Sequence, residues 1–416
     1  MARSSTGVTA RTPYFGFAVF GAFWGVWGAS VPAVRDQAGV TDGQLGTALL
    51  FVGAGALPAM QVAGRAVDRW GHRATAVLLV SLGAAGVLLA AIASDLWTLS
   101  AGLALVGASS GAADVGINSA AGSVEQATTR PVITRSHAVF SAAVVFASLV
   151  AGLMHGVGAP VVTPFLLVGL AAAAAGAIVA LDAGDGVDEA QPPGVGQASR
   201  PSRPSLRLLP LLVVGVLAAL AFAVENAHQS WSAVYLVDVL DAGAGVAAAG
   251  PAVFAAVVAV TRFAVSTVHT RHASAILVTG SAAAAAGTAV VATASNVLMA
   301  QVGLSLAAAG TAVLFPTLLS IVARHTDERA RGAATSVVTT VAYLGFLAGP
   351  VYVGRWADAV ELPGAMFAVA ALAALLAVLS WPVLRALAAG PAQWASRSDD
   401  PPRPSPVESP RDQPAQ

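Results

Sequence analysis

The chain has 416 residues, of which 56% are hydrophobic and only 10% are charged, and its formal net charge is zero. Soluble domains are about 25% charged, so this composition excludes an ordinary water-soluble enzyme and a nucleic-acid-binding protein. The chain contains no cysteine, which excludes disulfides, thiolate zinc sites and cysteine nucleophiles.

Twelve apolar runs are long enough to cross a bilayer as helices. They lack the alternation of barrel strands, so they predict an all-α integral membrane protein with twelve transmembrane helices. The first run follows Arg3 and Arg11 without a small-residue cleavage site, which favours an uncleaved span over a signal peptide. The runs are 14–34, 45–63, 74–94, 97–121, 137–157, 160–181, 208–236, 246–268, 273–294, 297–322, 333–354 and 364–387.

A polar segment rich in proline, glycine and charge separates the first six runs from the last six. An offset of 199 residues relates Gly111 to Gly310 and Arg130 to Arg329, which indicates two duplicated halves. Two halves around a midplane site are a recurrent plan of transporters. The predicted divisions are a cytoplasmic N-tail 1–13, an N-terminal six-helix bundle 14–181, a cytoplasmic linker 182–207, a C-terminal six-helix bundle 208–387 and a disordered cytoplasmic C-tail 388–416.

The arginines predict the orientation. All except Arg35 and Arg355 fall in the tails or in the connections after even-numbered runs, whereas the connections after odd-numbered runs are acidic. Because positive residues stay in the cytoplasm, we expect a multi-pass protein of the bacterial cytoplasmic (inner) membrane with both termini inside.

The connection between the second and third runs reads GRAVDRWGHR, residues 64–73. It resembles the signature G-x-x-x-D-R-x-G-[RK]-[RK] of the major facilitator superfamily, with His72 in place of one basic residue. The matching residues are Gly64, Asp68, Arg69, Gly71 and Arg73. The resemblance implies two six-helix bundles that alternately expose one site.

The same connection can be interpreted without the family. Gly71 permits a tight turn between two helices. Asp68 can pair with an arginine or cap a neighbouring helix, which predicts a latch, or gate, on the cytoplasmic side. Alternatively, these arginines only reflect the charge bias of cytoplasmic loops.

Asp114 and Asn118 lie one helical turn apart in the fourth run, on one face. This pattern resembles the branch that includes fucose permease, in which the acid implies proton coupling or sugar binding. A charged side chain inside a span costs about 2.5–3.5 kcal/mol, so Asp114 should face a cavity or a partner, or hold a proton. The alternative is a structural acid paired with a nearby arginine. The duplication places Val313 opposite Asp114, so the acid is not required by the fold.

Glu225 is the second acid deep inside a span. It shares one face of the seventh run with His228 and Gln229, and Asn226 adjoins it. We predict Glu225 as a second proton-coupling residue and the other three as substrate-binding residues. The alternative is a polar cluster that joins helices.

Three further residues are candidates. His137, at the start of the fifth run, has a side chain that can switch charge near neutral pH, so it is a third proton-coupling candidate; it could equally be a solvated surface residue. Trp24 and Trp27 could stack on a substrate in a cavity, or could lie at the membrane interface.

Together these features predict a secondary transporter that imports a small polar solute, with a sugar as one candidate, by proton-coupled symport. Asn118 would join the substrate-binding residues. The alternative is a proton-coupled efflux antiporter for an amphipathic compound, and a hypothesis of another class is a non-transporting membrane sensor. We expect no enzymatic activity, cofactor, metal site or nucleic-acid partner. The expected partners are the solute, protons and lipid, and the expected state is a monomer.

Overall fold

The structure is a computed structural model that describes residues 11–185, 205–265, 273–327, 330–388 and 395–396. The described chain is almost entirely helical. The N-terminal half contains α1 (Arg11–Ala38), α2 (Asp42–Ile92), α3 (Leu96–Thr128), α4 (Val132–Gly156) and α5 (Val162–Asp185). The C-terminal half contains α6 (Leu208–Asp238), α7 (Ala244–Ala247), α8 (Ala249–Val265), α9 (Ala273–Ala292), α10 (Val297–Ala312), α11 (Leu314–Arg324) and α12 (Arg331–Ala388).

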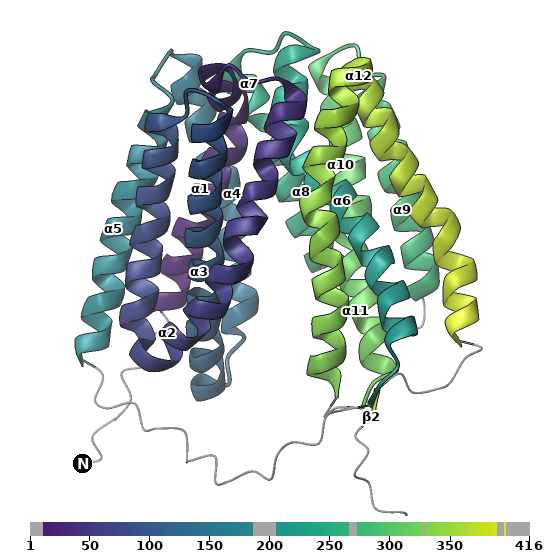
Figure 1. Ribbon diagram of the computed structural model, residues 1–416, viewed down its shortest axis with the longest axis horizontal. Coiled ribbons are helices and arrows are strands. Elements are labelled where there is room, and N and C mark those ends of the chain that lie inside the picture. Colours follow the sequence, from purple (N-terminus) through teal and green to yellow (C-terminus); the bar gives the residue numbers. More distant parts are fainter. Residues whose placement is uncertain (1–10, 186–204, 266–272, 328–329, 389–394, 397–416) are drawn as a thin grey trace, which may run out of the picture.

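Ten helical segments of the described chain are long and apolar enough to cross a membrane, and two of them, with 51 and 57 residues, are long enough to cross twice. The 51-residue α2 is interrupted at Gly71, where φ is 52° and ψ is −131°. The 58-residue α12 is interrupted at Val360 and Glu361, and Figure 1 shows it ascending and returning beside itself. Counting α2 and α12 twice gives twelve crossings, in agreement with the twelve apolar runs.

Local sequence explains where several helices begin. Thr41 caps α2 by accepting the N–H of Gln44, and Asn296 caps α10 by accepting the N–H of Met299. Asp95 caps α3 by accepting the backbone N–H of Thr98 at 2.8 Å, and this hydrogen bond lowers the pKa of the Asp95 carboxyl. These caps satisfy N–H groups that have no partner within the first helical turn.

Three boundaries differ from the prediction. Residues 64–73 are not an extended loop, because α2 remains helical on both sides of Gly71. The predicted tenth span is divided into α10 and α11 at Val313. Helix α5 continues to Asp185, and residues 205–206 form a strand, β1 (Ser205–Leu206), that pairs antiparallel with β2 (Ala395–Ser396). The remaining predicted linker and tails lie outside the described residues.

Small residues allow close helix packing in each half. A Cβ at Gly107 of α3 would overlap the backbone of Val52 in α2, and a Cβ at Gly345 of α12 would overlap the backbone of Ala219 in α6. Large apolar side chains such as Phe146, Leu170 and Leu298 lie exposed on the outside, as expected for surfaces that face lipid.

The two halves meet mainly at one end. Figure 1 shows α1–α5 on one side and α6–α12 on the other, approaching each other near α7 and diverging toward the end that carries β2. Helix α2 packs on α12, and α4 packs on α7 and α8. The described start of α1, the end of α5 and β2 all lie at the diverging end (Figure 1).

Candidate transport site

A cavity of about 350 Å³ lies between the two halves. Both halves contribute to its wall, and most of its side chains are aromatic or aliphatic. The N-terminal half supplies Phe20, Trp24, Trp27, Gly28, Val52, Gly53, Ala56, Leu57, Met60, Gly107, Ser110, Gly111, Asp114, Phe140 and Val144. The C-terminal half supplies Asn226, Gln229, Ser230, Pro251, Ala255, Tyr343, Phe346 and Leu347.

Asp114 is the charged residue of this wall. It is partly buried, and Asn118 donates from Nδ2 to its Oδ1 at 3.0 Å and to its backbone carbonyl at 2.9 Å. Among the residues that the structure describes, no arginine or histidine forms an ion pair with Asp114. The carboxylate therefore faces the cavity without a neutralising partner. Asn118 does not line the cavity; it orients Asp114.

Glu225 has a different environment. Its carboxylate is buried, and Arg262 of α8 donates to both of its oxygens from Nη2, at 3.1 Å and 3.3 Å. Gln229 donates from Nε2 to Oε1 at 3.2 Å. The expectation that Arg262 lies in the loop after the eighth span is wrong: it lies within α8. Glu225 thus lies behind the wall, and Gln229 is the member of this cluster that lines the cavity.

Two prolines explain how polar side chains are held beside the cavity. A proline has no N–H for the carbonyl four residues earlier in a helix. Pro316 therefore leaves the Ala312 carbonyl free, and Arg262 donates to it from Nε at 3.2 Å. Pro350 likewise leaves the Phe346 carbonyl free, and Asn226 donates to it at 2.6 Å.

The remaining predicted substrate residues divide into two groups. Trp24, Trp27 and Asn226 line the cavity. His228 does not: its Nδ1 contacts the Val224 carbonyl at 2.7 Å, its Nε2 contacts Thr288 at 3.0 Å, and its ring stacks on Phe254. His228 therefore joins α6, α8 and α9.

His137 also lies outside the cavity wall. Its ring is exposed and packs edge to face on Phe17, with 4.8 Å between the ring centroids. Arg262 of the other half interacts with His137 electrostatically.

Among the residues that the structure describes, no ion pair of the predicted cytoplasmic latch is present. Gly71 makes the predicted turn. Arg69 stacks on Trp70 at 5.5 Å, and Arg65 donates to the Gln61 carbonyl at 3.3 Å. Within the described ranges, Asp68 has no ion pair. Gly64 and Arg73 lie in the same segment, and the equivalent residues 266–272 of the other half lie outside the described residues.

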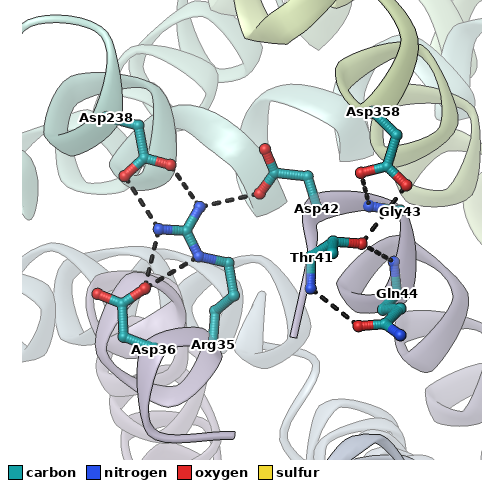
Figure 2. A network of polar contacts seen from close by, with 8 residues as sticks. All are labelled: Arg35, Asp36, Thr41, Asp42, Gly43, Gln44, Asp238 and Asp358. Carbon is teal, nitrogen blue, oxygen red and sulfur yellow. Dashed lines mark hydrogen bonds and ion pairs between the residues drawn. The ribbon is translucent and has the colours of Figure 1, made fainter. Parts of the chain in front are cut away.

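A network at the opposite end was not predicted (Figure 2). Arg35, at the end of α1, donates to Asp36 and Asp42 at 2.9 Å, and to both oxygens of Asp238 at the end of α6. This network, with Asp358 described next, joins the halves at their closed end. One feature of the sequence could have indicated this network: Arg35 is one of only two arginines predicted to lie on the outer side of the membrane.

Asp358 of α12 makes the second connection at the closed end. Its carboxylate accepts the backbone N–H of Gly43 at 2.9 Å and the hydroxyl of Thr41 at 3.4 Å, as Figure 2 shows. A carboxylate at the N-terminus of a helix is favoured by the helix dipole. A Cβ at Gly43 would overlap this carboxylate, so the contact requires glycine.

The comparisons with known proteins agree with this arrangement. The family model of the Major Facilitator Superfamily matches residues 14–350 and 270–414. The chain is 29% identical over 377 residues to "Uncharacterized transporter y4wD" of Sinorhizobium fredii (strain NBRC 101917 / NGR234), covering 89% of this chain and 96% of the relative. It is 28% identical over 382 residues to an uncharacterized MFS-type transporter of Yersinia pestis, covering 91% and 96%. It is 26% identical over 377 residues to "Membrane protein MosC" of Rhizobium meliloti, covering 90% and 89%.

Solved structures show the same fold. The D-xylose-proton symporter aligns with a TM-score of 0.69 at 13% identity, over 89% of this chain and 96% of that one. The nucleoside transporter NupG aligns with a TM-score of 0.68 at 13% identity, over 91% and 100%. Two six-helix halves with a cavity between them, and a family model that spans most of the sequence, establish that this chain is a membrane transporter that belongs to the Major Facilitator Superfamily.

Proposed function

We propose that the protein moves a small polar solute of about the size of a sugar across the bacterial inner membrane by proton-coupled symport. The observation that carries this proposal is Asp114, a carboxylate without an ionic partner among the described residues, in a cavity walled by both halves. The transporter relatives and the fold of the D-xylose-proton symporter support it.

Alternating access would require the closed end to open. With both termini in the cytoplasm, as the arginines predict, the Arg35 network lies on the outer side and the cavity communicates with the inner side. To open outward, the halves must separate Arg35 from Asp238 and Gly43 from Asp358. The same rocking motion would bring the Asp68 segment toward the other half, where the predicted latch would form.

Asp114 is the first candidate for the proton-coupling residue. When the halves close on both sides, water leaves the cavity, and an unpaired carboxylate becomes costly. Protonation removes that cost. The protein, empty or loaded, would therefore change between its inward-open and outward-open states only when Asp114 is protonated or paired with a cation. Glu225 is the second candidate, because a proton on it would release Arg262. His137 is the third.

The second candidate function is efflux of an amphipathic compound in exchange for protons. The composition of the cavity favours it, because its wall contains one carboxylate and six aromatic side chains: Phe20, Trp24, Trp27, Phe140, Tyr343 and Phe346. An aromatic wall contacts the apolar face of a solute.

Transport assays in proteoliposomes test both functions. Solutes that raise the melting temperature of the purified protein are added outside vesicles that contain a pH-sensitive dye. Symport acidifies the interior and exchange makes it alkaline. Asp114→Asn should abolish either response, and the control Asp241→Asn should not, since Asp241 lies in a turn after α6 away from the cavity wall. A full proton response from Asp114→Asn would remove Asp114 from the mechanism.

A further inference from the structure

The cavity contains a carboxylate without an ionic partner among the described residues, and its wall is largely aromatic. These two features indicate which chemical group the solute carries. We propose that the transported solute carries a primary ammonium group that pairs with Asp114. This inference rests on the proposed function in one respect, namely that the cavity is the transport site.

The charge of the wall is the first support. Among the described residues that line the cavity, Asp114 is charged and none is basic. Arg262 does not line the cavity and is already paired with Glu225. A carboxylate or phosphate on the solute would be repelled by Asp114, whereas an ammonium group would supply the missing partner.

The hydrogen-bonding groups are the second support, because several donors are already used inside the protein. Asn226 donates to the Phe346 carbonyl, Gln229 donates to Glu225, and Ser230 donates to Asn226. The Gln229 amide therefore has its oxygen and one N–H left for the solute. An N–H-rich group fits a cavity that offers acceptors.

The aromatic side chains are the third support. Trp24 and Trp27 come from α1, and Phe346 comes from α12, so rings from both halves line the cavity that contains the carboxylate. A cation near the face of an aromatic ring is attracted by the ring quadrupole, most strongly by tryptophan. The carbon skeleton of the same solute would pack against these rings.

The pairing has a consequence for coupling. If Asp114 is protonated before the solute arrives, formation of the carboxylate–ammonium pair releases that one proton. The solute and the proton then compete for one site, so for an ammonium solute Asp114 couples exchange, the second candidate function. Symport of such a solute would use Glu225, the second proton-coupling candidate. Asn118 on the same helix is the hydrogen-bond partner of Asp114, and Tyr343 of α12 is a titratable neighbour in the cavity wall. The side chains that α1, α2 and α4 contribute to this wall have no titratable group. The Glu225–Arg262 pair and His137 lie outside the wall.

Two sets of matched compounds test the proposal by equilibrium binding to the purified full chain, without a gradient. One set is D-glucosamine, D-glucose and D-glucuronate; the other is 2-phenylethylamine, 2-phenylethanol and 3-phenylpropionate. In at least one set, the ammonium compound should bind about tenfold or more tightly than its neutral counterpart, and the carboxylate should bind weakest. Fluorescence of Trp24 and Trp27 provides the readout.

Variants assign the preference to Asp114. Asp114→Asn should bring the ammonium and neutral compounds to similar affinity, whereas Asp114→Glu and Asp241→Asn should keep the preference. If Asp114→Asn does not fold, proton release by the wild-type protein in weak buffer gives a second readout. The ammonium compound should release up to one proton per site, and the neutral compound should release none.

Several results would overturn the proposal. They are equal binding of neutral and ammonium compounds, tightest binding of a carboxylate, or no binding of either ammonium compound at millimolar concentration. If a neutral solute drives Asp114-dependent proton movement in vesicles, the transport function stands and the ammonium proposal fails. If an ammonium compound binds through Asp114 but is not transported, the assignment of this cavity as the transport site fails instead.

Discussion

Asp114 and Glu225 are the same kind of group at similar depth in the two halves, yet they have opposite environments. Glu225 is neutralised by Arg262 and by the Gln229 amide, whereas Asp114 accepts a hydrogen bond only from a neutral amide among the described residues. A buried charge that is paired contributes to the fold, and one that is unpaired is tolerated for its function.

The helices behind these two groups account for the difference. Helix α3 is continuous through Asp114. The duplicated position in the other half is Val313, where α10 ends and α11 begins. Pro316 frees the Ala312 carbonyl at this break, and that carbonyl holds Arg262 in line with Glu225. The break thus positions the cation in one half, and the intact helix leaves the other half without one.

Substitution of Asp114 should have the largest effect, and only on transport. Asp114→Asn should reduce solute-driven proton movement to the level of empty vesicles and leave the melting temperature unchanged or higher, because an uncompensated charge is removed. Both are measured on the same preparation. A large loss of stability with normal transport would reverse the assigned roles of Asp114 and Glu225.

Removal of Arg262 should have the opposite signature. Arg262→Met leaves the buried Glu225 carboxylate unpaired, which should lower the free energy of unfolding by about 3 kcal/mol. The control is the double variant Glu225→Gln, Arg262→Met, which removes both charges and should recover most of the lost free energy of unfolding. Thermal unfolding in detergent measures both variants. Equal stability of the single and double variants would show that the ion pair contributes nothing.

Close packing of α2 on α3 should have the next largest effect, because it positions Asp114. Gly107→Ala forces a Cβ into the backbone of Val52 and should cost about 1–3 kcal/mol. The matched control is Gly122→Ala in the same helix, where a Cβ meets no atom within 4 Å and the change should gain about 0.5–1 kcal/mol. Equal unfolding temperatures for the two variants would contradict this packing.

We expect the Arg35 network to control which side of the membrane Asp114 faces. Arg35→Gln removes the connection from α1 to Asp238 and should raise the outward-open population about 5–30-fold, equivalent to about 1–2 kcal/mol. Because the chain has no cysteine, Met60→Cys in the cavity can be labelled by an impermeant maleimide from outside.

The control for this network is Arg355→Gln, the other arginine on the predicted outer side, which has no ion pair in the described part of the chain. Arg355→Gln should leave the labelling rate of Met60→Cys unchanged. Equal acceleration by both variants would mean that net charge, and not the network, controls the closure.

The smallest effect should come from Pro316. Pro316→Ala returns an N–H to the Ala312 carbonyl, in competition with Arg262. The energetic coupling between Pro316→Ala and Arg262→Met should be about 0.5–1 kcal/mol in a double-mutant cycle of unfolding. Pro382→Ala, in α12, is the control and should show no coupling. Independent effects of Pro316 and Arg262 would remove the proline from the account.

Much of the fold could be predicted from the sequence, because hydrophobic length and arginine placement are local properties. The all-helical membrane fold and the turn at Gly71 are confirmed, and ten long apolar segments, two of them interrupted, are consistent with twelve crossings. The prediction that Arg262 lies in a loop was wrong, because the sequence around a single arginine near a helix end does not show whether that arginine is in the helix or in the loop that follows. His228 could not be separated from Asn226 by helical spacing, because spacing alone does not show which partner helix each side chain faces.

The sequence by itself predicted helices that cross the membrane in two halves, because backbone groups find no water in the bilayer and must form hydrogen bonds within a helix. It also placed two acids inside these spans, where a charged side chain facing lipid would be costly. Only the tertiary structure decided which acid is neutralised and which faces a cavity. That outcome depends on contacts between α6, α8 and α10–α11, and between the two halves, whose partners are more than thirty residues apart in the chain.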